Sequence, residues 1–71
     1  MVNEAMFNQK VEENGVKFKF LSQKLGLSEN GLIKKRNGTI PFKVDEINML
    51  SELLHLTASE RDDIFDLRSS K

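Results

Sequence analysis

The stretch from Gly15 to Gly38, GVKFKFLSQKLGLSENGLIKKRNG, decides the fold of this 71-residue chain. Leu21 and Leu25 are four residues apart and therefore share one face of a first helix. Gly26 follows directly, and glycine adopts the left-handed conformation that ends a helix at little cost. Ser28 can then cap a second helix, because its hydroxyl accepts a backbone N–H that has no partner inside the helix. The stretch predicts two short helices joined by a tight turn.

The rest of the chain predicts three more helices and no strand. Asn3 is suited to cap a helix, and Thr57-x-x-Glu60 has the form of a capping box. No segment alternates polar and apolar residues as a half-buried strand does. The predicted helices cover residues 4–13, 17–25, 29–36, 44–54 and 58–67. The predicted core consists of Phe7, Val11, Leu21, Leu25, Leu32, Ile47, Leu50 and Leu54, with Ile64, Phe65 and Leu67 added by the last helix. We therefore expect one all-α domain over residues 1–71.

The composition argues against catalysis, a metal centre and a membrane span. The chain has no cysteine, and its one histidine, His55, follows a leucine pair near a predicted helix end, which is more typical of a partly buried or dipole-stabilised residue than of a catalytic base. Asp62, Asp63 and Asp66 lack the spacing of a calcium loop and are expected to form a solvated acidic face. No apolar run approaches the roughly 18 residues of a membrane span, and the N-terminus lacks a signal-peptide core. We expect a cytoplasmic protein that is not an enzyme and that has no cofactor or small-molecule ligand.

The charges are balanced overall but divided between the two halves of the chain. Lys plus Arg and Asp plus Glu both number 11, which gives a net charge of zero. Residues 1–43 carry eight basic and four acidic side chains, a net of +4, whereas residues 44–71 carry three basic and seven acidic ones, a net of −4. Such a division is common on solvated helix faces. It also suits a protein whose N-terminal half faces an anionic partner.

Three local features have the spacing found in one family of helix-turn-helix proteins: the Leu-Gly-Leu-Ser turn, the Asn37-Gly38 pair and the loop at Pro41. Over roughly residues 5–56 the chain resembles this family, the phage Cro and repressor proteins. The resemblance implies a lambda-repressor-like domain whose helix-turn-helix is formed by the helices predicted over 17–25 and 29–36. It also implies operator DNA as a partner. The implied contacts to bases are Ser28, Glu29, Asn30 and Lys34, and those to the DNA backbone are Lys35, Arg36 and Lys43.

Three positions depart from what the family usually has. Phe18 occupies the place of a glutamine that binds a phosphate, and Phe20 and Ile33 occupy outward positions where polar residues are usual. We interpret the three as an apolar surface, which marks protein interfaces more often than DNA-binding ones. An alternative is that the helix is rotated and that one phenylalanine belongs to the core. Lys35 also departs from the pattern, since the family more often has a core residue there.

These departures resemble small temperate-phage modulators of repression, which belong to the same family and bind the phage's own repressor. That resemblance predicts a regulator of the lysis–lysogeny switch that docks on the repressor's DNA-binding domain. The predicted anchors are Phe18, Phe20 and Ile33, accompanied by Lys19, Lys34, Lys35 and Arg36. The alternative is a Cro-like repressor that binds operator DNA as a dimer through the helix over 29–36. A third possibility is a helical domain that serves only for dimerisation.

Overall fold

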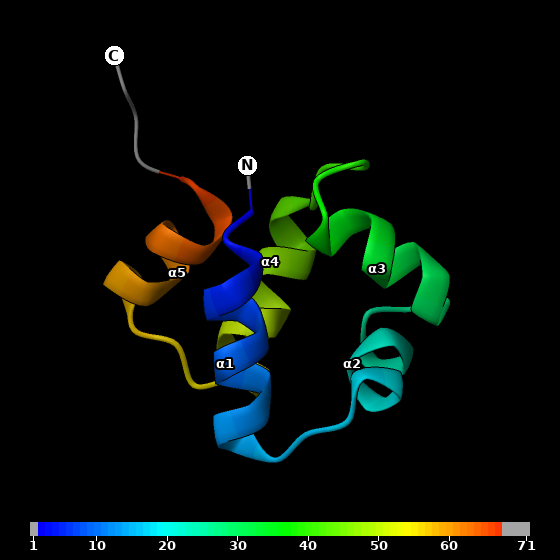
Figure 1. Ribbon diagram of the computed structural model, residues 1–71, viewed down its shortest axis with the longest axis horizontal. Coiled ribbons are helices and arrows are strands. Elements are labelled where there is room, and N and C mark those ends of the chain that lie inside the picture. Colours follow the sequence, from blue (N-terminus) through cyan, green and yellow to red (C-terminus); the bar gives the residue numbers. More distant parts are fainter. Residues whose placement is uncertain (1, 68–71) are drawn as a thin grey trace.

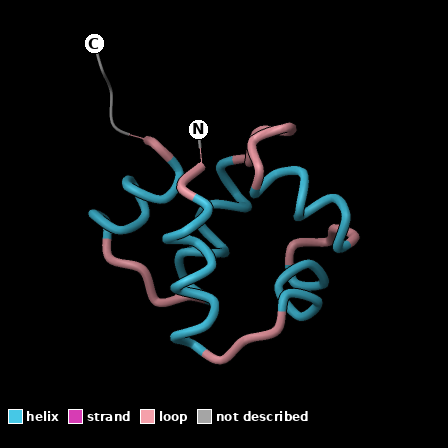
Figure 2. Tube along the Cα trace, in the orientation of Figure 1, coloured by secondary structure: helices cyan, strands magenta, loops and turns pink. Residues whose placement is uncertain are grey.

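Five short helices joined by short loops form the computed structural model, which describes residues 2–67 (Figure 1, Figure 2). No strand occurs within these residues, so the prediction of an all-helical fold is confirmed. The helices are α1 (Glu4–Asn14), α2 (Phe18–Lys24), α3 (Glu29–Arg36), α4 (Val44–Leu53) and α5 (Ala58–Phe65). Four of the predicted helices differ from these bounds by one or two residues at an end. The reason is that capping residues such as Lys17, Leu25 and Leu54 are flanking positions rather than full helical ones.

The helix ends are stabilised by the residues that the sequence indicated. The Asn3 side chain accepts from the Met6 backbone N–H at 3.1 Å. Thr57 and Glu60 form the predicted capping box: the Thr57 backbone N–H donates to Glu60 Oε1 at 2.9 Å, and the Glu60 backbone N–H donates to Thr57 Oγ1 at 3.1 Å. Gly15 ends α1 with a φ of 64°, a conformation that favours glycine. These local contacts explain why the helix boundaries follow from sequence so closely.

The helices form two groups that share one core. α5 packs against α1 and α4, and α2 packs against α3 on the opposite side of the molecule (Figure 1). The buried apolar residues are Phe7, Leu21, Leu32, Ile47, Leu50, Leu54, Ile64 and Phe65. Of the predicted core, Val11 and Leu25 are only partly buried against this cluster, and Leu67 is 45% exposed. Leu67 differs because α5 ends at Phe65, so the helical face that would have buried Leu67 does not continue.

Three phenylalanine rings join parts of the chain that are far apart in sequence. Phe7 stacks with Phe42 at 6.3 Å between ring centroids, and Phe65 meets both rings edge-on, at 6.4 Å from Phe7 and 5.1 Å from Phe42. Offset and edge-to-face arrangements at these distances are the favourable ones for aromatic pairs. Phe42 was not part of the predicted core, because it lies in a loop, where helical spacing gives no signal. The cluster fixes the loop after α3 against α1 and α5.

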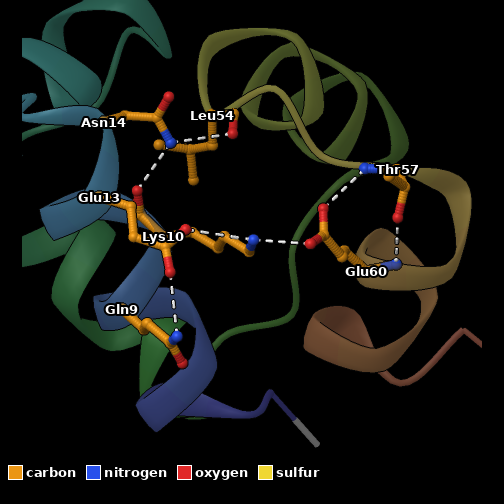
Figure 3. Close-up of polar contacts among 7 residues, drawn as sticks. All are labelled: Gln9, Lys10, Glu13, Asn14, Leu54, Thr57 and Glu60. Carbon is orange, nitrogen blue, oxygen red and sulfur yellow. Dashed lines mark hydrogen bonds and ion pairs between the residues drawn. The ribbon is translucent and has the colours of Figure 1, made fainter.

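Polar contacts join α1 to the end of α4 and to the first turn of α5 (Figure 3). Lys10 Nζ lies 2.6 Å from Glu60 Oε2, and Asn14 Nδ2 donates to the Leu54 carbonyl at 3.0 Å. The hydrogen bond from Lys10, with that from the Thr57 backbone, lowers the pKa of Glu60, and the same contact with Glu60 raises the pKa of Lys10. Glu60 therefore serves both as a helix cap and as an ion-pair partner.

His55 gives a stability prediction, because it follows α4 with a φ of 54° and is exposed. A side chain in the left-handed region costs about 1 kcal/mol, which glycine avoids. We expect His55→Gly to raise the free energy of unfolding by about 1 kcal/mol and the melting temperature by roughly 4–8 °C. Thermal unfolding followed by circular dichroism measures this. Glu52→Gly, exposed inside α4, should instead lower the melting temperature, and a lower value for His55→Gly would contradict the prediction.

Candidate functional site

Buried side chains of both helices and hydrogen bonds of the backbone fix the turn between α2 and α3. Leu21 of α2 and Leu32 of α3 are completely buried, and Ser22 is buried with its hydroxyl donating to the Lys19 carbonyl at 2.7 Å. Gly26 takes a φ of 71°, and the Leu27 backbone N–H donates back to the Ser22 carbonyl at 2.8 Å. These contacts orient α3 relative to α2 and leave the other side of both helices to solvent.

The N-terminal part of α3 is exposed. Ser28, Glu29 and Asn30 are all exposed, and Lys34 is exposed one turn further along. Ser28 caps α3, its hydroxyl accepting from the Gly31 backbone N–H at 3.0 Å. A Cβ atom at Gly31 would lie 3.2 Å from that same oxygen, so glycine relieves crowding at the cap. The structure therefore brings the four residues predicted to contact bases onto one accessible helix.

Lys35 was predicted to contact the DNA backbone, and the structure contradicts this. Its side chain is buried, the residue being 6% exposed, and its Nζ lies 2.6 Å from both carboxylate oxygens of Glu46 on α4. Lys35 is three residues after Leu32 and so shares the inward face of α3. Since its ammonium group already has a buried partner, Lys35 does not take part in the exposed face. Lys43 is exposed as predicted, and its backbone N–H donates to Glu46 Oε1 at 2.8 Å.

The environment of Glu46 determines its ionisation. Burial by itself would raise its pKa, but the hydrogen bonds from the Lys35 ammonium and the Lys43 backbone N–H outweigh that effect and lower the pKa below the ordinary 4.5. Glu46 therefore remains ionised at neutral pH, and its two oxygens join the end of α3 to the start of α4.

The lowered pKa values of Glu46 and Glu60 predict how stability depends on pH. Both carboxylates are more acidic in the folded protein than their ordinary 4.5, so their contribution is complete above pH 4.5 and is lost as the pH falls through the folded values. We expect the midpoint of urea unfolding to be nearly constant from pH 7 to 5 and to fall below pH 4.5. The Glu60→Gln variant should show a shallower fall, and a midpoint that rises on acidification would contradict this assignment.

Phe18 and Arg36 form a unit that differs from the predicted one. Phe18 was predicted to be an exposed anchor, but it is half-buried and packs against the core, as in the alternative of a rotated helix. The guanidinium carbon of Arg36 lies 5.0 Å from the centroid of the Phe18 ring. Arg36 also donates from Nη1 to Asn8 Oδ1 on α1, at 3.2 Å. Asn8 carried no sequence signal for this site, because the contact joins residues 28 apart in the chain.

Phe20 and Ile33 are the two predicted anchors that do lie at the surface. Phe20 on α2 is 40% exposed and Ile33 on α3 is 36% exposed. Lys24 lies over the Phe20 ring with its Nζ 5.5 Å from the centroid, and Lys19 and Lys34 are exposed on the same two helices. We call Phe20, Ile33, Lys19, Lys24 and Lys34 the α2–α3 face. It combines exposed apolar side chains with positive charge, and Lys24 is a member that the sequence did not single out.

Besides an open hollow of about 450 Å³ along α1, lined by α1 residues and Val16, a pocket of about 250 Å³ is a further surface feature to consider. It lies between the loop after α3 and the end of α5, and its lining includes Ile40, Phe42, Phe65 and Leu67. Small-molecule sites usually enclose about 300–1,000 Å³ and contain several polar groups aimed at the ligand. The pocket is smaller than that, and the only ammonium among its described lining residues, that of Lys35, is paired with Glu46. The α2–α3 face is therefore the better candidate.

Comparison with known proteins adds no relative. No family model, no curated protein and no solved structure matches this chain. Within residues 2–67, no helix combines the length and the apolar character needed to cross a membrane, and no three His, Cys, Asp or Glu side chains gather into a group that could hold a metal ion.

Proposed function

We propose that this chain is a transcriptional regulator of a temperate-phage switch, acting in the bacterial cytoplasm by binding the DNA-binding domain of the phage repressor. In this proposal α2 and α3 are the helix-turn-helix of a lambda-repressor-like domain, and the α2–α3 face is the contact surface. The resemblance of the segment from Gly15 to Gly38 to the Cro and repressor family supports the class of protein. The chemistry of the face supports the mode of action.

The observation that carries the proposal is the exposure of Phe20 and Ile33 among lysines. Large apolar side chains at a surface lose the stabilisation that burial supplies, about 1.5–3 kcal/mol for a full side chain. A partner that covers them recovers part of this, and buried aromatic and aliphatic anchors with a charged rim are typical of protein interfaces. Lys19, Lys24 and Lys34 supply such a rim and favour a partner with acidic residues around an apolar surface.

The number of free cations weakens the case for tight DNA binding by this chain alone. Four basic residues were predicted to contact DNA, but Lys35 is paired with Glu46 and Arg36 is engaged with Phe18 and Asn8. Of the four basic residues, Lys34 and Lys43 are exposed. Because affinity for DNA depends strongly on the number of phosphates that a protein neutralises, the loss of Lys35 from the predicted contacts favours weaker or partner-assisted binding.

A Cro-like repressor is the second candidate, and the exposed N-terminal part of α3 favours it. Asn30 has the amide that pairs with adenine in the major groove, and Lys34 has a donor suited to guanine. Ser28 and Glu29 lie beside them on the exposed side of the helix start. In this case the protein would bind its operator directly, as a dimer, through α3.

A gel-shift experiment with the promoter region of the protein's own gene separates the two functions. The protein is tested alone, the neighbouring phage repressor is tested alone, and the two are tested together, each at low and moderate salt. We expect no specific shift by this protein alone, and loss or further retardation of the repressor band when it is added. A specific, salt-sensitive shift by this protein alone would instead establish the Cro-like function.

A further inference from the structure

We infer that Arg36 is the carboxylate-binding residue of this surface, and that Phe18 and Asn8 are the residues that position it. The inference rests on the proposed function, because the carboxylate belongs to an Asp or Glu of the partner's DNA-binding domain. It assigns to Phe18 a different role from that of an exposed anchor. It also brings α1, through Asn8, into the binding site.

The orientation of the Arg36 side chain is defined by three helices. The arginine comes from the last turn of α3, and its guanidinium lies over the Phe18 ring of α2 at 5.0 Å. Nη1 donates to Asn8 Oδ1 of α1 at 3.2 Å. Stacking on an aromatic face restricts the plane of the guanidinium, and the hydrogen bond restricts its rotation within that plane. Together the two contacts leave one defined orientation.

The remaining donors show which edge is available to a ligand. Nε is buried and makes no hydrogen bond within the described residues, so no partner reaches it. Nη2 makes no hydrogen bond in the described part of the chain, and it is not among the buried atoms that lack a partner. The donors left for a ligand are therefore those of Nη2 and the second N–H of Nη1. Two parallel N–H groups of this kind match the two oxygens of a carboxylate.

Positioning in the free protein improves binding without adding a contact. An arginine that is free in solution loses rotamer freedom when it forms a bidentate pair, and that loss opposes association. Arg36 has already lost this freedom, because Phe18 and Asn8 hold it before any partner arrives. This role accounts for the aromatic ring of Phe18. The family that the chain resembles has at this position a glutamine that binds a phosphate.

The neighbouring residues favour a carboxylate over a DNA phosphate. Phe20 and Ile33 are exposed on the same two helices, and apolar side chains match a protein surface better than a phosphate backbone. Lys35, adjacent to Arg36, is not available to neutralise phosphate because it is paired with Glu46.

Titration calorimetry with the repressor's isolated DNA-binding domain tests the inference. Arg36→Lys keeps the charge but loses the planar fork and should weaken binding on the order of tenfold or more. Phe18→Leu removes the ring, Asn8→Ala removes the acceptor, and each should weaken binding by less. In the Arg36→Lys background the last two changes should weaken binding less than they do in the original protein, since the part of their effect that acts through Arg36 is already lost. Arg61→Lys, the same change on α5 and outside the α2–α3 face, is the matched control and should bind like the original protein.

A nuclear magnetic resonance measurement separates positioning from a general loss of structure. The Arg36 Nε–H signal should be sharp and shifted by the Phe18 ring in the free protein, and Phe18→Leu should abolish this shift while leaving the other backbone signals in place. Equal affinity of the Arg36→Lys variant and the original protein would overturn the inference alone. Failure of the original protein to bind the domain would overturn the proposed function, and the inference with it. Loss of DNA binding without loss of domain binding in Arg36→Lys would identify phosphate as the ligand and refute the carboxylate.

Discussion

Lys35→Ala is expected to remove a large part of this protein's stability. The substitution leaves the Glu46 carboxylate buried without the ammonium group that lies 2.6 Å from both of its oxygens. Removal of one partner from a buried ion pair costs about 3–5 kcal/mol. The total stability of a domain of this size is about 4–10 kcal/mol, so the loss is a substantial part of it. Urea unfolding followed by circular dichroism at pH 7 measures the change in the free energy of unfolding.

Two variants make the Lys35→Ala prediction specific to the buried pair. Lys34→Ala removes the neighbouring, exposed lysine and should change stability by no more than about 0.5 kcal/mol. Lys35→Met combined with Glu46→Leu removes both charges and should recover most of the stability, because an apolar pair needs no partner in the interior. If Lys35→Ala lowered the free energy of unfolding no more than Lys34→Ala does, the ion pair would not hold α3 to α4.

Phe20→Ala combined with Ile33→Ala is expected to abolish partner binding with little effect on folding. Both side chains are exposed by more than a third and neither belongs to the buried core, so we expect the protein still to fold when they are truncated. Central apolar anchors of an interface each contribute about 2 kcal/mol or more, so the double variant should lose about 4 kcal/mol, on the order of a thousandfold in Kd. Titration calorimetry against the repressor's DNA-binding domain gives the affinity, and circular dichroism gives the helical content.

Met49→Ala is the matched control for that experiment, because Met49 has the same 40% exposure as Phe20 but lies on α4. It should bind the repressor domain with unchanged affinity. Phe18→Ala is unsuitable as an anchor variant, since Phe18 packs against the core and its truncation would disturb folding as well as binding. Unchanged affinity of the Phe20 and Ile33 double variant would remove the α2–α3 face as the contact surface.

The two largest predictions are linked by the position of α3. The buried pair joins the last turn of α3 to the first turn of α4, whereas Ile33 and Lys34 on the other side of α3 belong to the α2–α3 face. A protein that presents a recognition surface on a helix of only eight residues needs contacts that orient it, because so short a helix has little stability of its own. Lys35 therefore helps to orient the α2–α3 face through its pair with Glu46, although it does not contact a partner itself.

The sequence by itself determined the number of helices, most of their ends and most of the core. These features depend on residues close together in the chain: the caps at Asn3, Ser28 and Thr57, the glycines after α1 and α2, and leucines at helical spacing. It also indicated that Phe20 and Ile33 lie outside the core, because Leu21 and Leu32 already occupied the inner faces of their helices.

Only the tertiary structure decided which charged and aromatic residues are available for binding. Lys34, Lys35 and Arg36 are adjacent and equally basic in sequence, yet the first is exposed, the second is paired with Glu46 and the third is held by Phe18 and Asn8. The partners of Lys35 and Arg36 are 11, 18 and 28 residues away, and no local pattern specifies pairs at such separations. The packing of α1, α2 and α4 against α3 brings Lys35 and Arg36 next to these partners. A buried charge is stable only when it is paired or hydrogen-bonded.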